Sequence, residues 1–195
     1  MTEHKKWLPG VLMFVGATYA LAQAQSEHPR PKEEQPPKEH AASVVQIVAL
    51  DECDPATFNA ALGPDFCKNV ALAPLGFATT LQDLFTKAAA GTPDPGWDFE
   101  PDKLNIKEGT TLLVTDQGGE PHTFTEVKNF GGGFVQDLNA GEETVSECTG
   151  GFKNVEVAKT RILQGSSVAV TDLSKGEHRF QCCIHPWMRM TVEVK

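Results

Sequence analysis

Alternating apolar and polar residues divide much of the chain after residue 42 into short segments with the period of β-strands. The first predicted strand covers residues 43–50 and is rich in β-branched residues. Further predicted strands follow, with glycine-containing turns between them, at 97–99, 104–106, 111–114, 123–127, 167–171, 177–182 and 190–194. Short strands at this spacing predict an all-β fold of the sandwich or barrel type.

Two segments between the first and second predicted strands carry helical signals instead. Asp54, followed by proline, is typical of an N-cap and predicts a short helix over residues 55–62. Thr80 and Asp83 resemble a capping box, and the apolar stripe around them predicts a second helix. We therefore expect a small helical insertion near the N-terminus of the β domain. The segment 130–165 is rich in glycine and predicts irregular structure.

The first 24 residues resemble a secretory signal peptide. Lys5 and Lys6 precede an uncharged apolar run over residues 8–22, and cleavage is expected after Ala22 or Ala24. The run is short beside the roughly 20 apolar residues that a membrane span needs, although an uncleaved anchor is the alternative. Cleavage would leave a mature form without a membrane span, in the periplasm or outside the cell.

The remaining chain divides into a linker and one domain. Residues 25–41 are rich in proline and glutamate and predict a flexible linker, and residues 42–195 form the expected domain. A hydrophobic content of 40% is enough for one ordinary core. The net charge of −9 gives no basic surface for nucleic acid and favours a basic protein partner. We expect the domain to be a monomer.

The chain contains 5 cysteines. In an oxidising compartment most cysteines form disulfides, so an odd number leaves one thiol that needs another role. Cys53 and Cys67 flank the first predicted helix and are expected to pair with each other.

The most informative motif joins the last two predicted strands. Cys182, His185 and Met188 stand there at C-x2-H-x2-M spacing. A thiolate, an imidazole and a thioether form, together with a second histidine, the ligand set of a blue-copper site. The sequence therefore predicts a copper site on this loop, completed by a histidine from elsewhere.

The pleat of the preceding strand separates the two adjacent cysteines. Phe180 and Cys182 share one face of an extended strand, and the apolar Phe180 marks that face as the inner one. Cys182 is therefore expected to face the metal. Cys183 points away and is free to form a disulfide, for which Cys148 is the expected partner.

Elimination among the 6 histidines selects the second imidazole. Three of them lie in the predicted signal peptide and linker. His178 precedes Cys182 by four residues on one strand, which places it more than about 10 Å away at about 3.3 Å per residue. His122 remains, at the point where a loop enters a predicted strand.

The segment from Phe99 to Lys195 resembles the cupredoxin family, the group of plastocyanin, azurin and amicyanin. The matching text comprises Phe99-Glu100-Pro101, the turn Lys107-Glu108-Gly109, Pro121-His122, and the loop from Cys182 to Met188, which is most similar to amicyanin. The resemblance implies a Greek-key β-sandwich. It also implies one type 1 copper ion per chain, bound by His122, Cys182, His185 and Met188.

The chain departs from the family pattern at Thr123, where many members have asparagine after the first histidine. The axial ligand also has an alternative, because Met190 would give a longer, plastocyanin-like spacing. The last strand favours Met188, since Met190 then alternates with Val192 and Val194 as a core residue.

The resemblance implies one-electron transfer without catalysis. Electrons would pass through the exposed edge of His185 to a redox protein, such as a cytochrome, an oxidase or a dehydrogenase. Pro186 and Trp187 would form an apolar docking surface around that edge. The alternative role for Trp187 is packing on the rim of the sandwich.

Other functions stay open at this point. A mononuclear copper enzyme similar to nitrosocyanin would need an open coordination position, and Glu120 is its candidate carboxylate unless it is a solvated loop residue. A copper storage or delivery protein would need an exposed site, and a disulfide-linked structural sandwich would need no metal. Multicopper oxidases use paired His-x-His motifs, which the sequence lacks.

Overall fold

Strand β1 (Val44–Leu50) lies inside the first of two four-stranded sheets. The structure is a computed structural model that describes residues 43–68 and 78–195, so the predicted signal peptide (1–24) and linker (25–41) lie outside the described residues. β1 pairs antiparallel with β2 (Asp98–Glu100) and parallel with β4 (Thr111–Asp116). β8 (Ser167–Val170) pairs antiparallel with β4 and completes the sheet.

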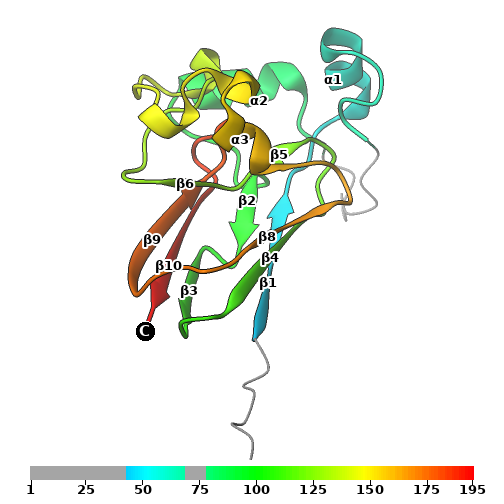
Figure 1. Ribbon diagram of the computed structural model, residues 1–195. Coiled ribbons are helices and arrows are strands. Elements are labelled where there is room, and N and C mark those ends of the chain that lie inside the picture. The colour runs from blue at the N-terminus through cyan, green and yellow to red at the C-terminus, as the bar shows by residue number, and fades with distance from the viewer. Residues whose placement is uncertain (1–42, 69–77) are drawn as a thin grey trace, which may run out of the picture. The chain divides into compact units, whose positions relative to one another are not determined.

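The second four-stranded sheet contains the end of the chain. Its strand order is β3 (Lys103–Ile106), β10 (Arg189–Val194), β9 (Gly176–Gln181) and β6 (Thr125–Val127). β10 pairs parallel with β3 and antiparallel with β9. Both sheets are therefore mixed, with one parallel pair in each (Figure 1).

Alternating residues from both sheets meet in one core. Phe124 links the layers, because its ring stacks on Phe180 at a centroid distance of 4.3 Å and meets Phe99 edge-on at 5.1 Å. Burial of such aromatic side chains is a large part of what stabilises a sandwich. The prediction of an all-β sandwich with a small helical part is confirmed.

Both predicted helices are present, with the predicted caps. Asp54 caps α1 (Pro55–Leu62) by accepting hydrogen bonds from the second and third backbone amides of the helix. Thr80 caps α2 (Leu81–Ala89) by accepting from the amide of Asp83. Each cap satisfies amides that would otherwise lack a partner. The helices lie at one end of the sandwich, the end that also carries the loop between β9 and β10 (Figure 1).

The sequence prediction was wrong for two segments. The predicted strand 123–127 is two short strands, β5 (His122–Thr123) and β6, because the amide of Phe124 bonds to a carbonyl beside β7 (Arg161–Ile162) before the chain joins β9. The segment 130–165, predicted to be irregular, contains β7 and several helical turns. These turns are η1 (Gln136–Leu138), η2 (Ser146–Cys148), η3 (Gly151–Lys153) and α3 (Val155–Lys159).

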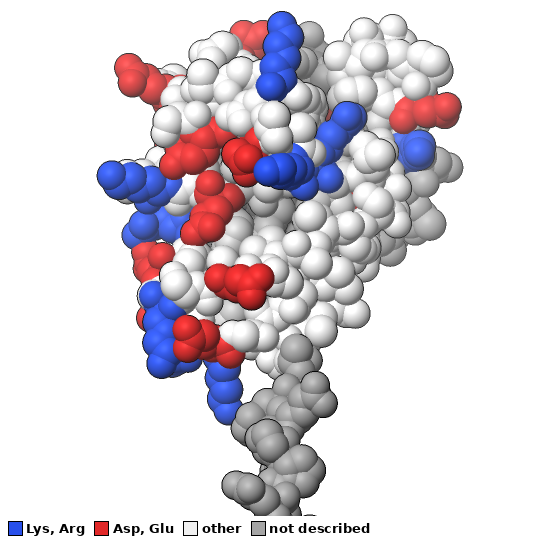
Figure 2. All heavy atoms as spheres, in the orientation of Figure 1, with Lys and Arg blue, Asp and Glu red and all other residues white. Residues whose placement is uncertain are grey.

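The surface carries charges of both signs. On the face shown in Figure 2 they gather mainly over the side of the sandwich formed by β6, β9 and β10, and a broad area beside them is free of charge. Within residues 43–68 and 78–195, no helix combines the length and the apolar character needed to cross a membrane.

Candidate metal centre

Three predicted ligands converge at the helical end of the sandwich. His122 begins β5, and Cys182 and His185 lie on the loop that follows β9. One donor atom of each lies within 4.8 Å of the others, and all three residues are buried. The Sγ atom of Cys182 is 3.9 Å from Nδ1 of His122 and 3.9 Å from Nδ1 of His185.

These separations suit donors that share one metal ion. Metal–nitrogen and metal–sulfur bonds of about 2.0 and 2.3 Å allow the two donor atoms to lie up to about 4.3 Å apart. Sulfur–nitrogen distances of 3.9 Å fall within that limit. A cysteine with two histidines is a donor set that binds copper, and the set also suits zinc.

The surroundings of the Cys182 sulfur favour its thiolate form. Burial alone would raise its pKa, but hydrogen bonding and charge from His122 and His185 hold the pKa well below its usual range. The backbone amides of Thr123 and His185 also point at Sγ, at 3.4 and 3.5 Å. A thiolate is the form of cysteine that binds metal, so this sulfur is a ready ligand.

The two candidate axial methionines occupy different positions. Met188 is fully buried on the ligand loop, where its carbonyl accepts from the amide of Cys182 and its amide donates to the carbonyl of His185. Met190 lies in β10 opposite Phe180, and the side chains of both methionines belong to the hydrophobic core. Met188 is thus tied by backbone bonds to two of the converging residues.

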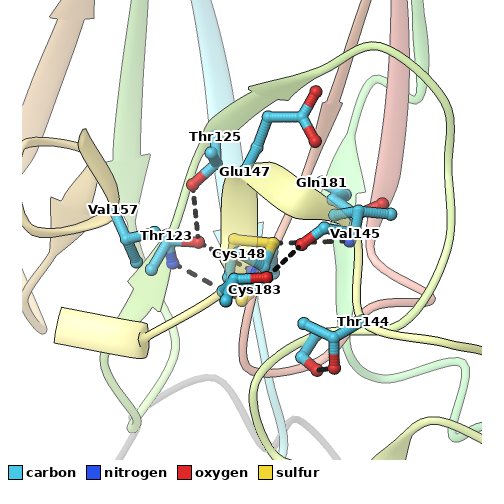
Figure 3. The surroundings of a disulfide bond; sticks show 12 residues. Thr123, Thr125, Thr144, Val145, Glu147, Cys148, Val157, Gln181 and Cys183 are labelled. Atoms are coloured by element: carbon cyan, nitrogen blue, oxygen red, sulfur yellow. Dashed lines mark hydrogen bonds between the residues drawn. A yellow bond between two sulfur atoms is a disulfide. The ribbon is translucent and has the colours of Figure 1, made fainter. Parts of the chain in front are cut away.

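The adjacent Cys183 belongs to the structural framework of the loop. It forms a disulfide with Cys148, and Cys53 pairs with Cys67, so both predicted disulfides are confirmed and Cys182 is the free cysteine. Figure 3 shows Thr123 beside the disulfide, with its Oγ1 accepting from the amide of Cys183 at 2.8 Å. Thr123 therefore bonds to the loop after β9 at two points, through its amide to Cys182 and through its Oγ1 to Cys183.

A buried carboxylate, which the sequence analysis did not identify, lies behind His122. Oδ2 of Asp51 is 3.0 Å from Nε2 of His122 and accepts the amide of Glu120 at 2.9 Å. Gly118 allows this approach, since a Cβ there would lie 1.9 Å from Oδ2 of Asp51. A carboxylate in this place fixes the ring and raises the basicity of a metal-binding histidine.

The charges of this pair depend on each other. Burial alone would raise the pKa of Asp51, yet the hydrogen bond and charge of His122 hold it below its usual value. Burial alone would lower the pKa of His122, yet Asp51 and Cys182 raise it well above its usual value. The signal that the sequence offered was indirect: Asp51 directly follows β1, and Asp116 ends the parallel neighbour of β1.

Glu120 lies behind the other histidine. The interpretation of Glu120 as a solvated loop residue was wrong, because only 2% of it is exposed. Its Oε2 accepts the indole N–H of Trp97 at 2.8 Å and lies 3.5 Å from Nε2 of His185. Glu120 therefore faces the nitrogen of His185 that points away from Cys182.

The expectation that His185 presents an exposed edge was also wrong, since 1% of the residue is exposed. The rings of Trp97 and Trp187 pack against it, with centroid distances of 6.1 and 5.5 Å. The reason is the segment before β2, which places the buried Trp97 beside the ligand loop. Trp187 is partly exposed, and its ring meets that of His185 edge-on.

Comparisons with known proteins give only distant similarities. No protein-family model matches the sequence, and no curated protein matches it. A purple cupredoxin from Nitrosopumilus maritimus is similar at 16% identity, over 77% of this chain and 99% of that chain, with a TM-score of 0.37. A reduced amicyanin variant is similar at 19% identity, over 49% of this chain and 71% of that chain, with a TM-score of 0.32.

Proposed function

We propose that this chain is a secreted type 1 copper protein, similar to the cupredoxins, that carries single electrons between redox partners. One observation carries the proposal: the free, buried Cys182 sulfur lies 3.9 Å from Nδ1 of both His122 and His185. A thiolate with two imidazoles is the equatorial set of a blue-copper site. The resemblance of the ligand loop to amicyanin adds Met188 as the weak axial donor.

The residues around the proposed site explain how the protein would carry an electron without a change in its structure. Copper would supply the change between Cu(II) and Cu(I) at a site held by His122, Cys182, His185 and Met188. The donors lie on two sheet-bound segments, tied together by amides that point at Cys182. Their burial excludes water, and the carboxylates behind the histidines keep both rings in place. A fixed ligand shell needs little rearrangement when one electron arrives or leaves.

The open-site enzyme and the delivery protein fit the described residues less well. Glu120 contacts Nε2 of His185 and the indole of Trp97, and this is not the position of a carboxylate that binds the metal beside Cys182. Delivery requires a site that a receiving protein can reach. The three converging residues are each 1% exposed or less.

Electron exchange is proposed to use Trp187. Its ring meets His185 edge-on and is partly exposed, whereas His185 itself is covered. A redox protein such as a cytochrome, an oxidase or a dehydrogenase would dock there through a small transient interface. The net charge of −9 would favour a partner with a basic surface. Two disulfides support a periplasmic or extracellular location.

Absorption and paramagnetic resonance spectra of the protein loaded with Cu(II) test the proposal. We expect an intense blue or purple thiolate band that disappears in Cys182→Ser and in His122→Ala. His178→Ala is the matched control, because His178 is held by Glu126 and Ser174 away from the site, and it should keep the band. A pale spectrum of the unaltered protein, with ordinary copper hyperfine splitting, would contradict the electron-carrier function.

A further inference from the structure

The His185 ring has different neighbours at its two nitrogens. Nδ1 lies 3.9 Å from the Cys182 sulfur, and Nε2 lies 3.5 Å from Oε2 of Glu120. The second distance is longer than an ordinary hydrogen bond, so it is a contact between the ring nitrogen and a carboxylate oxygen. Both side chains are at least 97% buried. Burial of a carboxylate away from water is costly, so further interactions are needed to hold Glu120 beside His185.

Trp97 supplies that support. Its indole N–H donates to the same Oε2 of Glu120, at 2.8 Å, and its ring packs against His185. The Trp97 ring also stacks with Phe58 of α1, at a centroid distance of 6.4 Å. The Cys53–Cys67 disulfide joins the segments that precede and follow α1. The helical insertion, which has no part in the ligand set, therefore braces the carboxylate behind His185.

Glu120 is also linked to the other histidine. Its backbone amide donates to Oδ2 of Asp51, the oxygen that lies 3.0 Å from Nε2 of His122. The outer nitrogens of both histidines are thus connected through Asp51 and Glu120. A displacement of Glu120 is expected to loosen the ring of His185 directly and that of His122 through Asp51.

We propose that Glu120, clasped by Trp97, is a positioning residue that holds Nδ1 of His185 towards Cys182 and thereby sets the affinity of the metal centre. This inference rests on the proposed metal site. Carboxylates behind metal-binding histidines fix the ring and raise its basicity, and their removal costs about 10–100-fold in metal affinity. The inference also gives the insertion around α1 a role in the function.

The test uses Co(II) as the probe, because a cobalt–thiolate band reports ligation by Cys182 without any electron transfer. The metal-free full chain is titrated with Co(II), and the affinity is read from that band. We expect Glu120→Ala to bind Co(II) about 10–100-fold more weakly than the unaltered chain, with altered visible bands. Glu120→Gln keeps one carbonyl acceptor and should recover part of the loss. Trp97→Phe keeps a smaller aromatic ring but lacks the indole N–H, and its Co(II) affinity should lie between those of Glu120→Ala and the unaltered chain.

Asp94→Asn is the matched control. Asp94 is another buried carboxylate in the segment before β2, but its Oδ2 bonds to Lys87 and Thr79 instead of a histidine. Asparagine keeps an oxygen for the amide of Gly96, so the turn that carries Trp97 is retained. This variant should destabilise the fold while leaving the Co(II) affinity unchanged. Thermal unfolding of each metal-free variant measures the loss of stability separately.

The outcomes separate the inference from the proposed function. Unchanged affinity in Glu120→Ala, or equal losses in Glu120→Ala and Asp94→Asn, would overturn the positioning role. If Glu120→Ala does not fold, Glu120→Gln decides, and a Co(II) spectrum and affinity identical to those of the unaltered chain would overturn the role. A missing cobalt–thiolate band in the unaltered chain would overturn the metal site itself.

Discussion

Nε2 of His122 lies 3.0 Å from Oδ2 of Asp51, and neither side chain is exposed to solvent. This contact leaves Nδ1 of His122 to face the Cys182 sulfur. A buried carboxylate with no positive partner is costly, so the pair is maintained as a unit. The orientation of the first proposed ligand thus depends on a residue 71 positions earlier in the chain.

Asp51→Asn is expected to weaken metal binding by about 10–100-fold, because the amide is a poorer acceptor and does not raise the basicity of His122. Competition with a Cu(I) chelator measures the change. Asp98→Asn is the control, since Asp98 bonds the amide of Phe99 in β2 and has no contact with His122 in the structure. Equal affinity of Asp51→Asn and the unaltered protein would contradict the role given to Asp51.

We expect the buried carboxylate of Asp116 to make the stability of the metal-free protein depend on pH. Burial raises its pKa from 3.8 to about 7, and Oδ2 has no partner among the described residues. Because the pKa of Asp116 is higher in the folded than in the unfolded state, protonation of Asp116 stabilises the fold. This contribution to the free energy of unfolding, on the order of 4 kcal/mol, is present below about pH 4 and is lost as pH rises through 7.

Asp116→Asn removes this titration and keeps an oxygen for the amide of Gly118. Urea unfolding should show the variant to be more stable than the unaltered metal-free protein at pH 8, with little difference at pH 4. The exposed Asp102→Asn should not change the difference between the two pH values. The same stability gap at both values for Asp116→Asn would count against a raised pKa.

The two disulfides should differ in their effect on the metal centre. They span sequence separations of 14 and 35 residues, for which chain entropy predicts losses of about 3 and 4 kcal/mol on removal. The double variant Cys148→Ala with Cys183→Ala should also weaken metal binding, because Cys183 adjoins Cys182. Cys53→Ala with Cys67→Ala should weaken metal binding less, because this disulfide acts on the site only indirectly, through Phe58 of α1 and Trp97. Denaturant unfolding and metal titration of both double variants test this expectation, which an inverted order would refute.

Met188→Leu and Met190→Leu distinguish the two axial candidates. Loss of a weak thioether donor at Met188 should raise the reduction potential and change the copper spectrum, since the thioether stabilises Cu(II). Met190→Leu alters a core residue of similar volume, and should cost less than about 1.5 kcal/mol without changing the spectrum. Voltammetry and absorption of both variants decide the matter, and a spectral change confined to Met190→Leu would reverse the assignment.

Local patterns in the sequence were sufficient for most of the fold. Alternation located the long strands, and the side chains of Asp54 and Thr80 marked the starts of α1 and α2, because caps and pleats depend on near neighbours. Parity and pleat also identified Cys182 as the free thiol, with Cys183 paired to Cys148. The break between β5 and β6 escaped detection, since a change of strand partner leaves no periodic signal.

The sequence by itself determined the β class and the loop that carries Cys182 and His185, and it predicted the sandwich and the two disulfide pairs that the structure contains. Only the tertiary structure decided what stands behind the histidines. Asp51 lies far from His122 in the chain and is brought to it by the parallel pairing of β1 with β4. Trp97 reaches His185 across the sandwich, because β2 and β9 belong to different sheets. Burial of Glu120 likewise needs Trp97, 23 residues away. Contacts over such separations depend on how strands pair, which no local pattern specifies.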